Sequence, residues 1–239
     1  MTTQSHHDHV EKQFSSQASE YLTSTVHASG RDLQRLAVRL ADYPDASVLD
    51  MGCGAGHASF VAAQNVSTVV AYDLSAHMLD VVAQAAEARQ LKNITTRQGY
   101  VESLPFADNA FDIVISRYSA HHWHDVGAAL REVNRILKLG GKLIVMDVMS
   151  PGHPVRDIWL QTVEALRDIS HTRNYASGEW LTLISEANLI VDNLITDKLP
   201  LEFSSWVARM RTPEALVDAI RIYHCLLYTS DAADDMQCV

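Results

Sequence analysis

The chain lacks any long hydrophobic run. No stretch of its 239 residues approaches the ~20 consecutive apolar residues that a membrane-spanning helix needs. The opening residues, MTTQSHHDHVEKQ, also lack the apolar core of a secretory signal. These two absences predict a cytoplasmic protein with no integral membrane segment.

Cysteine is scarce, and there is no excess of positive charge. The three cysteines, Cys53, Cys225 and Cys238, show neither a disulfide framework nor the paired spacing of a metal site, which fits a reducing compartment. Lys and Arg number 19 against 29 Asp and Glu, so the formal net charge is −10, and no basic cluster is present that would neutralise phosphates. The composition therefore predicts no metal and no nucleic-acid partner, and it leaves the oligomeric state open.

What the chain does contain is a regular alternation of strand and helix patterns. Apolar residues make up 47% and charged residues 20%, which is typical of a soluble globular domain. Strand patterns, of which 47–51 and 111–116 are apolar runs, are predicted at 47–51, 67–73, 94–98, 111–116, 142–148 and 189–196. Helical patterns follow Gly56, run from Ser75 to about Arg89, from about Asp125 to Lys138 and from Gly178 to Ala187, and start at Pro154 and Pro213. This alternation predicts an α/β fold with a mostly parallel twisted sheet and helices on both faces.

The length fits a single domain, which we expect to span residues 1–224. Two amphipathic patterns between His9 and Ala41 predict helices before the sheet, and we interpret 1–42 as a helical lid over a core at 43–150. The last segment, CLLYTSDAADDMQCV at 225–239, loses the helical period that starts at Pro213. It is similar to the conceptual translation of a transposon-type sequencing adapter. We interpret 225–239 as a non-native tail; the alternative is a genuine short helix with a polar end.

A glycine-rich loop follows the first predicted strand. Gly52, Gly54 and Gly56 come directly after Asp50, and glycine tolerates positive φ and adds no Cβ, so a ligand can approach the backbone closely. The spacing is GxGxG, and His57 stands where the third glycine of a dinucleotide-binding GxGxxG loop would be. The loop therefore predicts a ligand site, and His57 counts against a dinucleotide.

Two carboxylates accompany this loop. Asp73 ends the second predicted strand, where its two oxygens could accept hydrogen bonds from both ribose hydroxyls of an adenosine group, in S-adenosylmethionine as well as in NAD. Asp50 would repel a pyrophosphate but suits a ligand that carries an ammonium and a sulfonium. The alternative interpretation of Asp50 is a carboxylate that caps the amides of the loop.

Four segments, VLDMGCGAGHAS, VVAYDLSAHMLD, ESLPFADNAFDIVISRYSAHHW and REVNRILKLGGKLIVMD, resemble class I S-adenosylmethionine-dependent methyltransferases. They are similar to the subgroup that contains the ubiquinone and menaquinone C-methyltransferases, and VEKQFSSQASEYL looks like the first helix of that subgroup. The resemblance implies a Rossmann-like sandwich whose seventh strand lies antiparallel between strands five and six. Nothing after His224 looks like that strand, so we predict six strands and a missing or malformed seventh.

The resemblance also assigns the cofactor contacts. It implies that Gly52, Gly54 and Gly56 line the methionine and ribose portion, that Asp73 holds the ribose and that Leu74 and Met78 flank the adenine. The amide of Val101 would meet adenine N1. Tyr100 departs from the family pattern, which has an acid at this position to accept the adenine amino group, so its ring is expected to stack on the adenine or to cover the pocket.

Candidate catalytic residues follow the fourth predicted strand, at the carboxyl edge where α/β folds place their ligands. Arg117 could bind the carboxylate of the cofactor or an oxygen of the substrate. His121 and His122 titrate near neutral pH, so either could accept a proton. Phe14 and Tyr21, on the first predicted helix, are expected to close over the cofactor.

The sequence therefore predicts S-adenosylmethionine-dependent methyl transfer to a small organic acceptor, with a quinol precursor as the more specific hypothesis. A sulfonium methyl group is already activated, so its transfer needs alignment more than strong catalytic groups. Two alternatives stay open at this point: a nicotinamide-dependent oxidoreductase and a non-catalytic protein that binds an adenosine cofactor.

Overall fold

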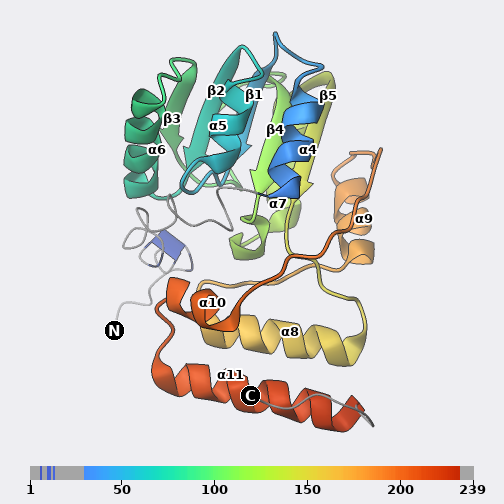
Figure 1. The fold of residues 1–239 in the computed structure, drawn as a ribbon. Coiled ribbons are helices and arrows are strands. Elements are labelled where there is room, and N and C mark those ends of the chain that lie inside the picture. Colours follow the sequence, from blue (N-terminus) through green and yellow to red (C-terminus); the bar gives the residue numbers. More distant parts are fainter. Residues whose placement is uncertain (1–5, 7–9, 12, 14–29, 232–239) are drawn as a thin grey trace, which may run out of the picture.

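The computed structural model describes residues 6, 10, 11, 13 and 30–231. Five strands form one sheet: β1 (Ser47–Met51), β2 (Thr68–Asp73), β3 (Ile94–Gln98), β4 (Phe111–Arg117) and β5 (Leu137–Met146). Their order is β3-β2-β1-β4-β5, and every neighbouring pair is parallel (Figure 1). The predicted α/β class and parallel sheet are confirmed.

The two central strands, β1 and β4, are the most apolar, because both of their faces are covered by helices. Val48, Leu49, Val114 and Ile115 have no exposed surface. β2 and β3 extend the sheet on one side of β1, whereas β4 and β5 extend it on the other. The strand order therefore reverses between β1 and β4, and parallel α/β sheets bind ligands in the crevice at the carboxyl ends of such a pair.

Helices cover both faces of the sheet (Figure 1). On one face lie α4 (Arg31–Leu40), α5 (His57–Ala63) and α6 (Ala76–Ala88). Side chains of α4 and α5 pack there against Val48 and Ile113, and those of α6 pack against Ala71. The other face carries α7 (Val126–Ile136) and α9 (Ser177–Glu186) over Leu49 and Val114.

A further group of helices follows β5. It consists of α8 (Pro154–Arg167), α10 (Phe203–Arg209) and α11 (Glu214–Asp231), which lie beyond the carboxyl ends of the strands in Figure 1. Val163, Trp206 and Ile220 bury their side chains against one another here. The sequence reading missed α10, a helix of only seven residues. No described helix is long and apolar enough to cross a membrane.

The predicted strand at 189–196 is wrong. Residues 189–202 form no regular element, and the side chain of Ile190 is 89% exposed. Ion pairs hold this segment: Lys142 pairs with Asp192 at 2.7 Å, and Arg35 pairs with Asp197 at 3.0 Å. The apolar residues of this segment are compatible with a strand, but no described strand pairs with it. The sheet formed by residues 30–231 therefore has five strands, not the six that we predicted.

Two predicted boundaries also differ. The helix expected to reach Lys138 is α7, which ends at Ile136, and β5 begins at the next residue, Leu137. Gly140 and Gly141 therefore lie inside β5, where its pairing with β4 is irregular. A Cβ on Gly141 would come within 2.8 Å of the Lys138 carbonyl oxygen, which explains a glycine inside a strand.

The last helix, α11, continues to Asp231, past the point where the sequence suggested that the helical pattern ends. A helix says nothing about the origin of its residues. The proposal that 225–239 is a non-native tail therefore stays a proposal.

Candidate functional site

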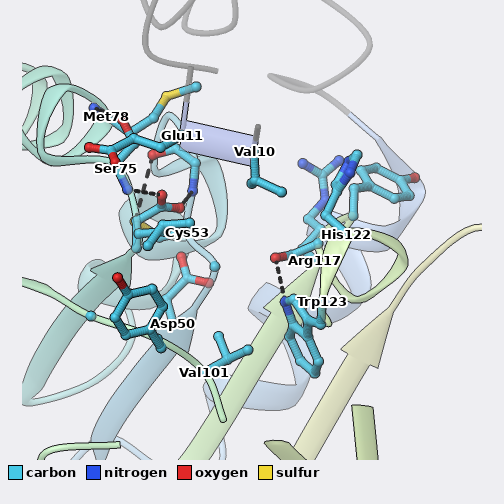
Figure 2. A pocket seen from close by; sticks show the side chains of 18 of the residues that line it. Val10, Glu11, Asp50, Cys53, Ser75, Met78, Val101, Arg117, His122 and Trp123 are labelled. Atoms are coloured by element: carbon cyan, nitrogen blue, oxygen red, sulfur yellow. Dashed lines mark hydrogen bonds between the residues drawn. The ribbon is translucent and has the colours of Figure 1, made fainter. Parts of the chain in front are cut away.

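A cavity of about 1030 Å³, partly open to solvent, lies at the carboxyl ends of β1, β2 and β4. Residues from five parts of the chain line it: the N-terminal segment, the glycine loop, the end of β2, the loop after β3 and the turn after β4 (Figure 2). Ten residues predicted for the site lie in this lining: Asp50, Gly52, Gly54, Asp73, Leu74, Met78, Tyr100, Val101, Arg117 and His122. Gly56 and His121 are not part of it.

The glycine loop needs glycine for different reasons at its three positions. All three have positive φ, at +72°, +51° and +84°. A Cβ on Gly52 would lie 1.9 Å from Ser119 Oγ, whereas one on Gly54 would meet nothing within 4 Å, so the cavity side of Gly54 is open. A Cβ on Gly56 would meet Val82 and Phe60. Gly56 thus lets α5 and α6 pack, and it does not line the cavity; its expected contact with the cofactor stays a prediction.

The Asp73 carboxylate is fixed by backbone amides. One oxygen accepts a hydrogen bond from Gly54 N at 2.8 Å and the other from Ser75 N at 2.9 Å. Burial raises the pKa of Asp73, and these hydrogen bonds oppose the rise. The side chain is therefore held rigidly on the cavity wall between the glycine loop and the start of α6.

Asp50 is almost fully buried at the end of β1, with 1% of its surface exposed. Its Oδ2 accepts a hydrogen bond from Ser59 Oγ at 2.6 Å, while Oδ1 has no hydrogen-bond partner. Burial raises the pKa of Asp50 to about 6, although Ser59 opposes the rise. Asp50 thus bonds to Ser59 on α5 and not to an amide of the glycine loop, which disfavours the capping interpretation. A buried carboxylate with an unpartnered oxygen suits a cationic ligand.

Arg117 ends β4 and is 9% exposed. It forms an ion pair with Asp32 of α4, and its guanidinium carbon lies 4.6 Å from the centre of the Tyr118 ring. Tyr118 has a φ of +52°, an uncommon value for a residue with a side chain. Asp32 and the unusual backbone together place the guanidinium on the cavity wall, opposite Asp50 in Figure 2.

The loop after β3 forms the side of the cavity expected to hold the adenine. The backbone oxygen of Tyr100 accepts a hydrogen bond from the Tyr72 hydroxyl at 2.9 Å, and the Tyr100 side chain is 51% exposed. Val101 and Leu74 lie in the lining, together with Met78, which is buried at the start of α6. The ring of Tyr100 therefore belongs to the rim of the cavity.

The two histidines of the η1 turn (Ala120–His122) have different environments. His122 lines the cavity, whereas His121 Nδ1 lies 2.6 Å from Asp147 Oδ1 outside it. Burial alone would lower the pKa of His121, but the charge and hydrogen bond of Asp147 outweigh it and raise that pKa. Burial and the neighbouring His121 lower the pKa of His122 well below its ordinary value. The histidine that faces the cavity is thus neutral at neutral pH.

The predicted lid residues Phe14 and Tyr21 lie outside the described residues. The described part of the same segment does reach the site, because Val10 and Glu11 line the cavity (Figure 2). Gln13 Nε2 donates a hydrogen bond to the backbone oxygen of Met210, 3.2 Å away after α10. The segment therefore connects the cavity to the helices beyond β5.

Sequence reasoning missed several residues of the site. Glu11, Glu102, Ser119 and Trp123 line the cavity, and Asp32 and Asp147 hold lining residues or their neighbours. For Ser119 and Trp123 the sequence held one usable signal, because they stand four residues apart on either side of the histidines. In the structure, Trp123 Nε1 donates a hydrogen bond to Ser119 Oγ at 2.9 Å. The four acidic residues had no such signal in the sequence.

The lining fits S-adenosylmethionine. Four of its carboxylates, those of Glu11, Asp50, Asp73 and Glu102, would repel the pyrophosphate of a dinucleotide. They suit a ligand with an ammonium, a sulfonium and a ribose diol, and the unpartnered Asp50 Oδ1 is a ready acceptor. Among the residues that the structure describes, no three His, Cys, Asp or Glu side chains gather as a metal site would require.

Comparisons with known proteins agree with this geometry. Residues 49–145 match the family described as Methyltransferase domain. The chain is 35% identical to the uncharacterized methyltransferase YcgJ of Bacillus subtilis (strain 168) over 96% of its own length and 90% of that protein's. The crystal structure of YcgJ superposes with a TM-score of 0.78, at 33% identity over 85% of each chain. This chain belongs to the S-adenosylmethionine-dependent methyltransferases, and S-adenosylmethionine is its cofactor.

The chain is similar to two further relatives. The chain is 92% identical to the uncharacterized protein YafE of Escherichia coli (strain K12) over 172 residues, which cover 72% of this chain and 83% of YafE. It is 29% identical to the demethylmenaquinone methyltransferase of Lactococcus lactis subsp. lactis (strain IL1403), over 68% of this chain and 66% of that enzyme. The matches to YcgJ and to demethylmenaquinone methyltransferase favour a methyl donor over a nicotinamide cofactor.

Proposed function

We propose that this methyltransferase acts on a small organic acceptor and that a quinol precursor is that acceptor. The cavity in which Asp50, Asp73 and the glycine loop meet is the observation that carries the methyl-donor half of the proposal. The acceptor half draws support from the similarity to demethylmenaquinone methyltransferase and from the motifs shared with that subgroup.

The residues that would hold the cofactor follow from their positions. The open side of Gly54 accommodates the methionine portion, and Asp73, fixed by two amides, accepts from the ribose hydroxyls. Arg117 is the cation on the wall opposite Asp50, so it would bind the methionine carboxylate, while Asp50 attracts the ammonium. Leu74 and Met78 form the apolar contact for the adenine.

S-adenosylmethionine supplies a methyl group that is already activated by its sulfonium. The protein therefore has to align the acceptor and exclude water. Trp123, 5% exposed, and Val10 supply apolar surface beside the turn after β4. The neutral His122 on the same wall would accept a hydrogen bond from an acceptor hydroxyl and so orient it. Burial lowers the pKa of His122, so water rather than this ring would be the final acceptor of the proton.

The donor half is tested by calorimetric titration with S-adenosylhomocysteine. Asp73→Ala should weaken binding by about tenfold to a hundredfold, because a ribose loses charge-assisted hydrogen bonds. Asp80→Ala is the matched control, since Asp80 is an exposed residue of α6 outside the cavity, and it should bind like the wild type. Equal affinity of the two variants would contradict the placement of the ribose.

The acceptor half needs a separate measurement. The chain is incubated with S-adenosylmethionine labelled with ¹³C in its methyl group and with a reduced naphthohydroquinone that carries a short prenyl chain. We expect labelled methylated product together with S-adenosylhomocysteine. Normal S-adenosylhomocysteine binding with no labelled product would exclude the quinol and leave the donor in place.

A further inference from the structure

Asp147 connects two segments that meet beside the cavity. It directly follows β5 and has a side chain only 4% exposed. Its Oδ2 accepts a hydrogen bond from Ala120 N at 2.8 Å, and its Oδ1 accepts from Val148 N at 2.7 Å and contacts His121 Nδ1 at 2.6 Å. One carboxylate thus ties the end of β5 to the η1 turn through both the backbone and the side chain of the turn.

The same turn is tied to a third segment. The backbone oxygen of His121 accepts hydrogen bonds from Thr172 N at 2.8 Å and Arg173 N at 3.3 Å, in the loop after α8. The rings of His121 and His171 lie 5.9 Å apart. His121 is therefore the point at which the turn after β4, the end of β5 and the loop after α8 come together.

In this position, the η1 turn and its neighbours complete the cavity wall. Ser119, His122 and Trp123 all line the cavity, although neither Asp147 nor His121 does. Ser119 lies directly against the glycine loop, because a Cβ on Gly52 would come within 1.9 Å of Ser119 Oγ. A small shift of the turn would therefore move the wall and the loop relative to each other.

We propose that Asp147 and His121 form a positioning pair, whose ion pair holds the η1 turn against the glycine loop and so sets the wall that faces the methyl acceptor. Neither residue touches the reacting atoms. The inference rests on the proposed function for its consequence in methyl transfer, but the geometry of the pair can be tested without turnover.

The surroundings of His121 decide how the pair responds to pH. Asp147 faces it from the end of β5, Glu164 and Arg167 from α8, and His122 and His171 from the adjoining turn and loop. The acids favour the imidazolium and outweigh burial and Arg167, so the pKa of His121 is raised. A raised folded-state pKa means that the ion pair is complete below the ordinary histidine pKa and is lost as the pH rises through the higher value.

Trp123 provides a readout that does not depend on activity. It stands on the same turn and donates a hydrogen bond to Ser119. In nitrogen-15 spectra, we expect the Trp123 indole resonance, assigned with Trp123→Phe, to shift in a single step at the pH where the His121 ring titrates. That step should move to lower pH in Asp147→Asn, in which burial lowers the His121 pKa. It should vanish in His121→Gln, which keeps a donor but has no titrating ring.

Turnover on the naphthohydroquinone gives the second readout. Asp147→Asn should lower kcat by about tenfold to a hundredfold through misalignment, with a much smaller change in the dissociation constant of S-adenosylhomocysteine. Asp192→Asn is the control, because it breaks an exposed ion pair with Lys142 and should change neither value.

A Trp123 resonance that ignores the titration of His121 would overturn the proposal, and that result needs only wild-type protein if the variants fail to fold. Wild-type kcat in Asp147→Asn would overturn it too. A clear Trp123 step in a chain that transfers no methyl group would support the pair and reject the proposed function.

Discussion

At the scale of the residue, burial of the charged Asp50 carboxylate lowers the stability of the folded chain at neutral pH. The pKa of Asp50 rises from 3.8 to about 6, which corresponds to about 3 kcal/mol. Because the folded chain holds this proton more tightly than the unfolded chain, the stability that the group contributes is complete below pH 3.8 and is lost as the pH rises through about 6. A buried charge kept at neutral pH against this cost points to a cationic ligand.

Replacing Asp50 by Asn should therefore separate stability from binding. At pH 7.5 we expect Asp50→Asn to raise the melting temperature of the ligand-free chain, since a neutral amide costs less to bury. The affinity for S-adenosylmethionine should fall at least about tenfold. It should also lack the decline below pH 6 that we expect for the wild type as Asp50 becomes protonated. Scanning calorimetry and titration measure the two effects, with exposed Asp45→Asn as the control. A variant with a lower melting temperature and normal affinity for S-adenosylmethionine would contradict both expectations.

The residues found from the sequence were those with a local signal. Asp50 and Asp73 stand at strand ends beside glycines, so a single stretch of sequence identifies them as candidates. Asp32 contacts Arg117, 85 residues away, and Asp147 contacts His121, 26 residues away. The sequence around either acid does not indicate these partners. Which of two adjacent histidines faces the cavity likewise depends on a turn whose course is set by Asp147.

At the scale of the element, β1 to β4 were predicted nearly to the residue. For β1, β2 and β4 the reason is that buried parallel strands are largely apolar runs, whereas β3, with the sequence ITTRQ, is mostly exposed. The segment at 189–196 has a similar pattern but no neighbouring strand in the described structure, and a single segment's pattern carries no information about its neighbours. The boundary between α7 and β5 was misplaced for a related reason. The two glycines look like a helix end, and only the pairing with β4 shows that they belong to a strand.

The N-terminal segment is the element whose contribution to binding is most open to test. Val10 and Glu11 line the cavity, and Gln13 reaches Met210. Deleting residues 1–13 should weaken S-adenosylhomocysteine binding by about tenfold, because one wall and one carboxylate are lost. Glu11→Gln should account for only part of this loss, since it keeps the wall. Calorimetry on both variants checks the expectation, and unchanged affinity after the deletion would rule out a lid role for this stretch.

At the scale of the whole molecule, the described sheet ends at β5, whose outer edge pairs with no described strand. Within the described residues β5 pairs only with β4, and the neighbouring segment exposes Ile190, Leu194 and Ile195 by 89%, 55% and 56%. An unpaired strand edge beside exposed apolar side chains favours pairing between chains. The net charge of −10 opposes this association, and salt screens that repulsion.

We therefore expect the chain to self-associate as its concentration rises, and more strongly at high salt. Sedimentation velocity over a hundredfold concentration range measures this. Ile190→Lys combined with Ile195→Lys should shift association to higher concentration, because each lysine places a charge where the apolar contact would form. Ile158→Lys is the matched control: Ile158 is 62% exposed but lies on α8, among the helices beyond the carboxyl ends of the strands. If the control shifts association as much as the double variant does, the contact is not at this edge, and a chain that sediments as a monomer throughout would show that the edge is protected.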